Sequence, residues 1–350
     1  MKKTNLLMDL ILRKRNQRQN AELLQIQSPN SIVESRYVKI GGIDQWVTIR
    51  GEDRNNPVLL VIHGGPASTY SIFSPLLRSW EKYFTIVQWD QRGAGKTFTR
   101  NGEDGYGTIS FDILTQDGIE LAEYLINKLH QPQVILLGSS VGSLTGIMMA
   151  KQRPDLFYAY VGTDQNAPDS GNLAYRLTLD ALRAAGHSKG AQLVEKMGPD
   201  RSKWNRKDFD KRNQYLVKAS QDVPNMVMDL ILPCMLSSPE HRISDIIDYF
   251  RGMSFSLHHL FDALVTFDFS KVGFRFELPV FIFHGDKDIV TPTALAKSFF
   301  DGIEAPHKEF TLIRNAGHLA CFARAEQFLE ELLNRVLPLI ADTNNKTQKR

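Results

Sequence analysis

The sequence has 350 residues, of which 42% are hydrophobic and 23% are charged, and it contains 24 Gly, 15 Pro and 2 Cys. This length predicts one large domain, or one domain with an insertion. The 20 Phe residues supply apolar side chains for a large core, which excludes disordered and low-complexity proteins. The two cysteines, Cys234 and Cys321, exclude a disulfide framework and do not resemble a zinc site.

Charge is concentrated near the start of the chain. The whole sequence carries +3, but residues 1–20 hold six basic residues and one acidic residue, so they carry +5 and the remaining 330 residues carry −2. The net charge of the remaining 330 residues therefore excludes a basic nucleic-acid-binding protein.

Residues 1–30 are interpreted as a basic N-terminal extension. Its apolar run Leu6–Leu12 is interrupted by Asp9, is too short to span a bilayer and is not followed by a cleavage site, so no secretory signal is expected. We expect the extension to fray or to pack on the protein itself, with contact between residues 1–20 and a membrane surface as the alternative. A cytoplasmic location is expected, the polar tail 341–350 is expected to be loose, and the oligomeric state stays open.

The first half of the chain alternates between strand and helix patterns. Two alternating runs, Tyr37–Ile40 and Gln45–Ile49, flank a Gly-Gly pair and predict a β-hairpin. The next apolar runs are too continuous for half-exposed strands and are typical of parallel strands buried on both faces: Pro57–Ile62, Phe84–Trp89, Val134–Leu137 and Phe157–Val161. Helical patterns separate them at Ser71–Lys82, Phe111–Leu129 and Ser143–Gln152. This alternation predicts an α/β fold whose mainly parallel central sheet is covered by helices.

The alternation stops after residue 165. Residues 166–276 are mostly helical in pattern, as in Leu173–Ala185, Ala191–Met197, Gln214–Ser220, Val227–Leu232 and Ser244–Phe250. Strand-like runs resume at Pro279–Phe283 and Glu309–Ile313, and the helix Arg324–Ile340 follows. We therefore expect a core formed by residues 31–165 and 277–340, with a helical insertion at 166–276.

The motif with the clearest chemistry is G-x-S-x-G at residues 138–142. It follows a predicted buried strand directly and precedes a helix, which is the strand–turn–helix setting of a nucleophilic serine. Spacing selects Ser140 over Ser139, because only Ser140 has glycine two residues before it and two residues after it. The N-terminus of the following helix also places positive dipole near a developing oxyanion.

A second motif, His63-Gly64-Gly65-Pro66, follows the strand at 57–62. An oxyanion hole needs two converging backbone N–H groups. We expect Gly65 to supply one, since Pro66 fixes the loop, and Val141 to supply the other. His63 is expected to hold the turn by hydrogen bonds.

A serine nucleophile needs a base and an acid that orients the base. Asp286 and Asp288 follow the strand at 279–283, and His318 follows the strand at 309–313. The order Ser140, Asp288, His318 is that of the α/β-hydrolases. Asp288 is favoured over its rival Asp286 because an acid three residues after the glycine can turn back toward the histidine. A neutral histidine base predicts activity that rises with pH around 6.5 if its pKa is unperturbed.

Two other features have structural interpretations. The segment 92–97 resembles part of a phosphate-binding P-loop, but Asp90 stands where that motif needs glycine, so no nucleotide site is expected. We expect Asp90 and Arg92 to be tied into internal hydrogen bonds. Cys321 lies near His318 but within an apolar run, where a buried packing role is expected. No metal and no organic cofactor are implied.

Taken together, His63–Pro66, Trp89–Gly95 and the turn at Ser140 resemble the prolyl aminopeptidase (proline iminopeptidase) branch of the α/β-hydrolase superfamily, from about Tyr37 to Leu339. The resemblance implies a Ser140, Asp288 and His318 triad, an oxyanion hole from Gly65 and Val141, and a helical cap at 166–276. It also implies the release of N-terminal proline from small peptides through an acyl-enzyme.

The sequence departs from that branch at two places. Val141 stands where the peptidases usually have tryptophan, and the stretch Lys203–Lys207 is basic where they carry amine-binding glutamates near tryptophans. Glu195, Asp208 or Glu240 could bind an amine instead. The alternative prediction is therefore a carboxylesterase, lactonase or amidase acting on a small non-peptide substrate, and a more remote one is a non-catalytic receptor for a small ligand on the same fold.

Overall fold

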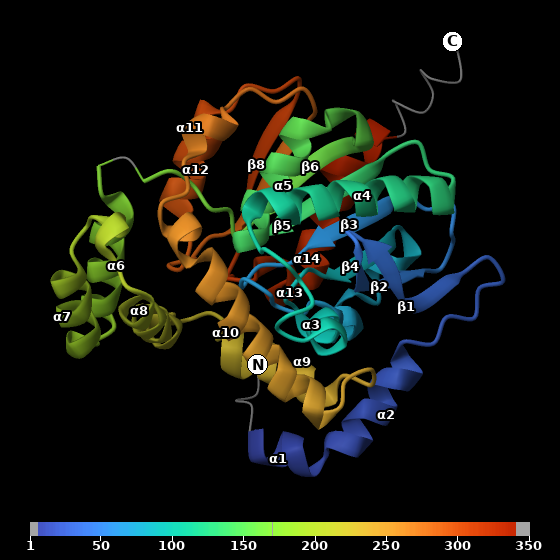
Figure 1. Cartoon of the computed structure of the whole chain (residues 1–350), viewed down its shortest axis with the longest axis horizontal. Helices are drawn as coiled ribbons and strands as arrows, with labels where there is room; N and C mark the ends of the chain where they lie inside the picture. The colour runs from blue at the N-terminus through green and yellow to red at the C-terminus, as the bar shows by residue number, and fades with distance from the viewer. Residues whose placement is uncertain (1–5, 170, 341–350) are drawn as a thin grey trace.

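The computed structural model describes residues 6–169 and 171–340, so the tail predicted at 341–350 lies outside the described residues. The strands in this part form an eight-stranded sheet in the order β1-β2-β4-β3-β5-β6-β7-β8 (Figure 1). Their bounds are β1 (Ile32–Ile40), β2 (Ile43–Gly51), β3 (Val58–Ile62), β4 (Thr85–Asp90), β5 (Val134–Ser139), β6 (Phe157–Thr163), β7 (Val280–Gly285) and β8 (Lys308–Ile313).

The sheet begins with the predicted hairpin. β1 and β2 pair antiparallel, with Ile40 opposite Ile43, and the two-residue turn needs positive φ at both Gly41 (56°) and Gly42 (79°). β2 pairs antiparallel with β4, and every later pairing, from β3–β4 to β7–β8, is parallel. The predicted mainly parallel sheet is therefore confirmed.

The continuous apolar runs are explained by two cores, one on each face of the sheet. On β3, Val58, Leu60 and Ile62 belong to one core, whereas Leu59 and Val61 belong to the other. The first core contains side chains of α4 (Phe111–Leu129), α5 (Val141–Gln152) and α12 (Thr293–Gly302). The second contains those of α13 (Ala320–Ala323) and α14 (Ala325–Glu331). A strand buried on both faces has no face directed to solvent, so the alternation of apolar and polar residues disappears.

Two predicted helices differ from the structure. The segment predicted at 71–82 forms two 3₁₀ helices, Ser71–Leu77 and Trp80–Lys82, in place of an α-helix. Pro75 lies inside the first and has no N–H for a continuing α-helical ladder. The helix predicted at Arg324–Ile340 includes a π-helical turn at Leu332–Val336. Outside residues 166–276, the structure has further helices that were not predicted: α3 (Gly95–Asn101) after β4, a 3₁₀ helix at Pro154–Leu156 before β6, α12 between β7 and β8, and α13 after β8.

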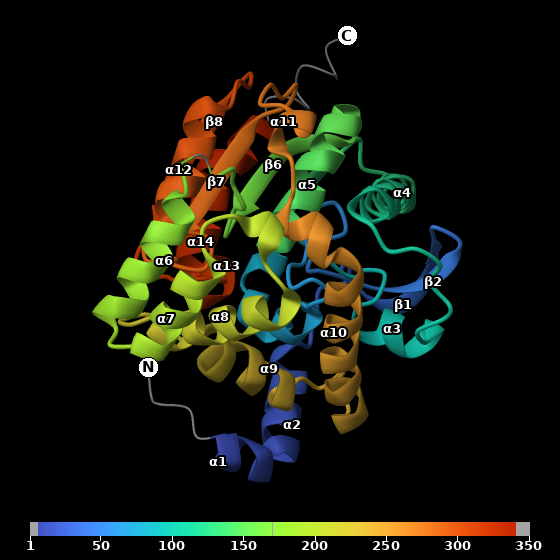
Figure 2. The ribbon, with the colours of Figure 1, turned by 60° about the vertical axis from the view of Figure 1, so that its left-hand side comes forward.

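Between β6 and β7 the described residues form helices, and we call residues 166–276 the helical segment. Its helices are α6 (Leu173–Ala184), α7 (Ser188–Met197), α8 (Arg206–Ala219), α9 (Leu232–Ser237), α10 (Ile243–Val265) and α11 (Phe269–Val272), with a 3₁₀ turn at Arg201–Lys203 and a π-helix at Met226–Ile231. Figure 2 shows α6, α7 and α8 as one group beside the sheet, and these helices share a small core of their own, which includes Leu182, Val194 and Leu216.

The N-terminal extension forms α1 (Leu6–Ile11) and α2 (Arg13–Leu23), and it is docked on the rest of the protein. Side chains of Arg13, Gln17 and Asn20 donate hydrogen bonds of 2.7–3.0 Å to backbone carbonyls in the turn 237–241. Leu7 and Ile11 each expose 67% of their surface, so contact with a membrane surface stays a prediction. Within residues 6–169 and 171–340, none of the helices has the length and apolar character needed to cross a bilayer.

Candidate active site

Ser140 occupies a sharp turn between β5 and α5. Its backbone, at φ 54° and ψ −126°, lies in a sparsely populated region, which the surrounding packing must hold in place. The carbonyl oxygen of Ser140 accepts hydrogen bonds from Ser143 Oγ (2.6 Å) and Asn166 Nδ2 (2.7 Å). A Cβ atom at Gly142 would lie 2.3 Å from the carbonyl oxygen of Ile62, so the turn has no room for a side chain there.

The loops after β7 and β8 bring an acid and a histidine to Ser140. His318 Nε2 lies 2.9 Å from Ser140 Oγ, and His318 Nδ1 lies 2.8 Å from Asp288 Oδ2. Backbone N–H groups of Val290 and Thr291 donate to Asp288 Oδ1, at 2.8 and 3.0 Å, and fix the carboxylate in its orientation. Ser140, Asp288 and His318 are all buried. The arrangement has the hydrogen-bond order of a nucleophile, a base and an orienting acid.

The rival acid, Asp286, faces elsewhere. Its Oδ1 accepts a hydrogen bond of 3.1 Å from the N–H of Ala316, and it makes no hydrogen bond to His318 within the described residues. Asp286 and Asp288 are therefore only two positions apart in the same loop, but Asp286 helps to shape the loop, whereas Asp288 contacts the imidazole.

The environment of His318 favours its charged form. Burial by itself lowers the pKa of His318, but the charge and hydrogen bond of Asp288, together with the charge of Asp164, raise that pKa to about 9. For Asp288, burial raises the pKa, yet the neighbouring His318 outweighs it and lowers the pKa overall. The sequence-based expectation of a pH midpoint near 6.5 assumed an unperturbed histidine, which the structure contradicts.

Asp164 is a site residue that sequence reasoning missed. It follows β6 at a positive φ of 49°, and its buried carboxylate accepts hydrogen bonds from Ser139 Oγ (3.0 Å) and from the N–H of Ala320 (3.1 Å). Burial raises the pKa of Asp164. The available signal was an acid directly after a buried strand, which is the feature that drew attention to Asp286 and Asp288.

The cluster of Asp164, Asp288 and His318 contains residue types that bind metal ions. One side-chain nitrogen or oxygen of each residue lies within 4.8 Å of the others. However, both ring nitrogens of His318 already take part in hydrogen bonds, one to Ser140 and one to Asp288, so neither has a free lone pair to offer a cation. The residues fit a proton-transfer chain better than a coordination sphere.

The loop at residues 63–66 is fixed by His63, as expected. The N–H of Gln91 donates to His63 Nε2 (3.1 Å), and His63 Nδ1 donates to the carbonyl oxygen of Gly64 (2.9 Å). Burial lowers the pKa of His63 to about 4, so the ring is neutral and can accept at one nitrogen. Gly65 and Val141 line the same cavity as Ser140.

The loop after β4 is also fixed from within, as expected. Asp90 Oδ2 accepts a hydrogen bond from the N–H of Lys96 (2.8 Å), and the Arg92 guanidinium pairs with both carboxylate oxygens of Asp117 (2.8 and 3.1 Å). Cys321 is buried among apolar side chains, which confirms its packing role.

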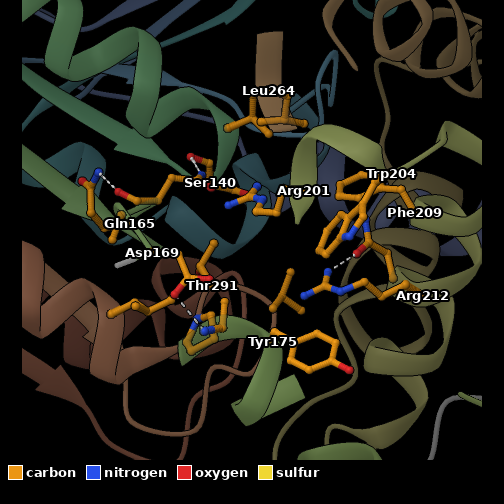
Figure 3. Close-up of a pocket in the computed structure, with 18 of the residues that line it drawn as sticks. Ser140, Gln165, Asp169, Tyr175, Arg201, Trp204, Phe209, Arg212, Leu264 and Thr291 are labelled. Carbon is orange, nitrogen blue, oxygen red and sulfur yellow. Dashed lines mark hydrogen bonds between the residues drawn. The ribbon is translucent and has the colours of Figure 1, made fainter. Parts of the chain in front are cut away.

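A cavity of about 110 Å³ opens beside Ser140 (Figure 3). This volume is several times the roughly 10–15 Å³ that a single water molecule needs, so a small substrate group fits. The helical segment contributes much of its wall, including Asp169, Tyr175, Arg201, Trp204, Phe209 and Arg212.

The acids expected to bind an amine do not line this cavity. Glu195 pairs with Arg183 at 2.6 Å, Asp208 Oδ2 accepts from Asn205 at 2.9 Å, and Glu240 Oε1 accepts from Ser35 at 3.1 Å. The cavity wall therefore gives no support to amine binding by these three acids. The acid that does line the cavity is Asp169.

Comparison with known proteins agrees with this geometry. Residues 57–325 match the family model of the alpha/beta hydrolase fold. A probable aminopeptidase, YbaC of Bacillus subtilis (strain 168), is 27% identical over 315 residues, covering 84% of this chain and 93% of that protein. A proline iminopeptidase of Lactobacillus delbrueckii subsp. lactis is 22% identical over 305 residues, covering 86% and 97%.

Solved structures share the fold. A proline iminopeptidase from Mycobacterium smegmatis superposes with a TM-score of 0.62 at 16% sequence identity, covering 89% of this chain and 100% of the other. A proline iminopeptidase-related protein from Thermus thermophilus superposes with a TM-score of 0.55 at 18% identity, covering 86% and 96%. Because the family match spans well over half of the sequence, the chain belongs to the alpha/beta hydrolase fold family and is a hydrolase.

Proposed function

We propose that this hydrolase works through an acyl-enzyme, with Ser140 as nucleophile, His318 as general base and Asp288 as the acid that orients the base. The observation that carries the proposal is the continuous hydrogen-bond chain from Ser140 Oγ through both ring nitrogens of His318 to Asp288 Oδ2, with contacts of 2.9 and 2.8 Å. Such a chain lets a neutral imidazole take the hydroxyl proton while the carboxylate stabilises the resulting imidazolium.

The reaction has two halves. As Ser140 Oγ forms a bond to the substrate carbonyl carbon, its proton moves to His318 Nε2, and the N–H groups of Gly65 and Val141 stabilise the oxyanion. His318 then donates that proton to the leaving group as the acyl-enzyme forms. In the second half, His318 accepts a proton from water, the hydroxide attacks the acyl carbon, and the proton returns to Ser140 Oγ as the acid product leaves.

We also propose that the helical segment, residues 166–276, is a cap inserted between core residues 31–165 and 277–340. In support, the cavity wall is shared between core residues such as Gly65 and Val141 and residues of the segment such as Trp204. A cap of this kind excludes water and shapes the pocket that selects the substrate.

Two substrate classes follow from the comparisons and from the cavity. The proline iminopeptidases among the relatives support release of N-terminal proline, with Asp169 as the carboxylate available to a substrate ammonium group. The second candidate is a small ester, lactone or amide that has no free amine. It is favoured by Arg201 and Arg212, because two guanidinium groups in the cavity repel an ammonium group.

The nucleophile can be tested without knowing the substrate. A fluorophosphonate probe reacts with an activated serine, forming an O–P bond as the P–F bond breaks, and we expect it to label the wild-type protein but not Ser140→Ala. Ser139→Ala is the matched control, because Ser139 Oγ contacts Asp164 and Tyr70 and makes no hydrogen bond to His318 among the described residues; it should still be labelled. Equal melting temperatures of Ser140→Ala and wild type would show that folding is intact, and labelling of Ser140→Ala would contradict the proposal.

The substrate class is tested by parallel hydrolysis of prolyl-p-nitroanilide and p-nitrophenyl acetate. Ser140-dependent release from the prolyl compound would support the aminopeptidase activity. Ser140-dependent release from the ester alone would favour the second class.

A further inference from the structure

The cavity beside Ser140 contains two arginines whose charges are not neutralised. Arg201, in the 3₁₀ turn at 201–203, and Arg212, in α8, both lie close to Trp204: their guanidinium carbons are 5.7 and 5.3 Å from the centre of its ring. Arg212 exposes 7% of its surface. Figure 3 shows both side chains directed toward the space that Ser140 also faces.

Their hydrogen bonds leave much of their donor capacity unused. Arg212 donates to Asn213 Oδ1 and Thr178 Oγ1, both at 2.9 Å, and both acceptors are neutral. Arg201 donates no hydrogen bond within the described residues. The Nε atoms of both arginines are buried without a partner in that part of the chain. A guanidinium has five N–H donors, so the pair can still bind a group with several acceptor oxygens.

Two other buried arginines of this protein are paired with carboxylates. Arg50 pairs with Glu81 at 2.6 Å, and Arg92 pairs with Asp117 at 2.8 Å. Neither Arg201 nor Arg212 has a carboxylate within ion-pair distance among residues 6–169 and 171–340; the charge of Asp169 raises the pKa of both, while the charge of Arg201 lowers that of Arg212. Burial lowers the pKa of both arginines, that of Arg212 to about 9, which reflects the free-energy cost of an unpaired cation.

We propose that Arg201 and Arg212 bind a carboxylate of the substrate, so that the natural substrate is an ester or amide formed from one end of a short dicarboxylic acid. The free carboxylate would take the place that Glu81 and Asp117 fill for the other two arginines, and the ring of Trp204 would contact the methylene chain between the two carboxyl groups. This inference rests on the proposed function of Ser140, since the second carboxyl group is the one that Ser140 attacks.

The test compares two esters of equal chain length. Mono-p-nitrophenyl glutarate carries a carboxylate at its far end, and p-nitrophenyl valerate carries a methyl group there. We expect kcat/KM of the wild-type protein to be at least about 10-fold higher for the glutarate, since hydrogen bonds to a charged group are worth roughly one to two powers of ten in affinity. Arg201→Gln and Arg212→Gln should each lower this ratio by about 10-fold or more.

The control is Arg206→Gln, an arginine of α8 that is paired with Ser254 and Asp210 and does not line the cavity. The ratio of kcat/KM for the glutarate to kcat/KM for the valerate should be the same in Arg206→Gln as in the wild type. Arg201→Gln is the variant that keeps the test informative if Arg212→Gln unfolds, because Arg201 contributes no hydrogen bond to the fold within the described residues.

Failure of this inference is distinguishable from failure of the proposed function. If the fluorophosphonate labels Ser140 while the glutarate is hydrolysed no faster than the valerate, the carboxylate site is refuted and the serine mechanism stands. If the ratio is high but unchanged in Arg201→Gln and in a folded Arg212→Gln, the arginines are not the binding groups and the inference is likewise refuted. If Ser140 is not labelled, both are refuted.

Discussion

Replacing Asp164 by Asn removes a negative charge beside His318 while keeping the shape of the side chain. The carboxylate and the imidazole each offer an atom within 4.8 Å of the other. An amide can keep both local contacts, accepting from the N–H of Ala320 and donating to Ser139 Oγ, which then donates to the Tyr70 hydroxyl. The variant therefore isolates the electrostatic contribution of Asp164.

The direction in which the pH midpoint should shift in Asp164→Asn follows from the role of His318 as the base. His318 must be neutral to accept a proton, and with its pKa raised to about 9 the value of kcat/KM should rise with pH and reach half its maximum near pH 9. The Asp164 carboxylate stabilises the imidazolium. Without it the pKa of His318 falls, so the neutral, active form is reached at lower pH.

The magnitude can be estimated by setting the separation of the two charges at 4.8 Å, the distance within which a carboxylate oxygen of Asp164 and a ring nitrogen of His318 lie. Coulomb's law gives ~3.5 kcal/mol at an effective dielectric constant of about 20 and ~0.9 kcal/mol in bulk water. One pH unit corresponds to ~1.4 kcal/mol, so the midpoint should fall by roughly 0.6 to 2.5 pH units in Asp164→Asn.

The assay is kcat/KM against pH, from pH 5 to 10, with a p-nitrophenyl ester that the wild-type protein hydrolyses. Asp286→Asn is the matched control, since Asp286 bonds the N–H of Ala316 and not the imidazole, and its midpoint should stay close to that of the wild type. An unchanged midpoint in Asp164→Asn would refute the reasoning, because it would mean that this carboxylate carries no charge when His318 titrates.

Two further predictions concern stability, measured as the free energy of unfolding in urea. Gly142→Ala should destabilise the protein by about 1–3 kcal/mol, because the new Cβ would lie 2.3 Å from a backbone oxygen of β3. Gly302→Ala is the control, and it should be close to neutral because a Cβ there would have only Phe274 within 4 Å. Equal losses for the two variants would contradict the packing argument. Asp117→Ala should cost about 3–5 kcal/mol, since it leaves the buried guanidinium of Arg92 without its carboxylate, and a loss below about 1 kcal/mol would show that the charge finds another partner.

The sheet could be predicted from sequence because each buried strand is a short apolar run between turns. Strand β3 needs apolar residues at every position, since both faces are covered, and such a run is recognisable without a structure. The 3₁₀ geometry at Ser71–Leu77 was not recognised, although Pro75 was the signal that an α-helical ladder could not continue there.

The candidate site could be predicted only in part. Motif spacing led to Ser140, Asp288 and His318, but the geometry that separates Asp288 from Asp286 depends on the loop N–H groups of Val290 and Thr291, which a sequence does not reveal. The cavity was missed for a different reason. Charged residues in a helical pattern normally face solvent, and nothing local marks Arg201 or Arg212 as facing inward.

The docking of the N-terminal helices links two parts of the molecule that are far apart in sequence. On one side Arg50 and Arg78 donate hydrogen bonds to backbone carbonyls of Leu24 and Leu23, and on the other the side chain of Asn20 bonds the carbonyl of Ser237 at the end of α9. The extension thus acts as a noncovalent crosslink between the sheet and the helical segment.

A crosslink of this kind should lower the frequency with which the sheet and the helical segment move apart. The turn after α9 leads into α10, and α10 supplies Leu264 to the cavity wall. Local opening of that wall should therefore require the N-terminal helices to release, and amide hydrogen exchange in α10 should accelerate when residues 1–25 are removed, while the distances among Ser140, His318 and Asp288 stay the same. In that case access to the cavity would depend on the N-terminal helices, whereas the geometry within it would not.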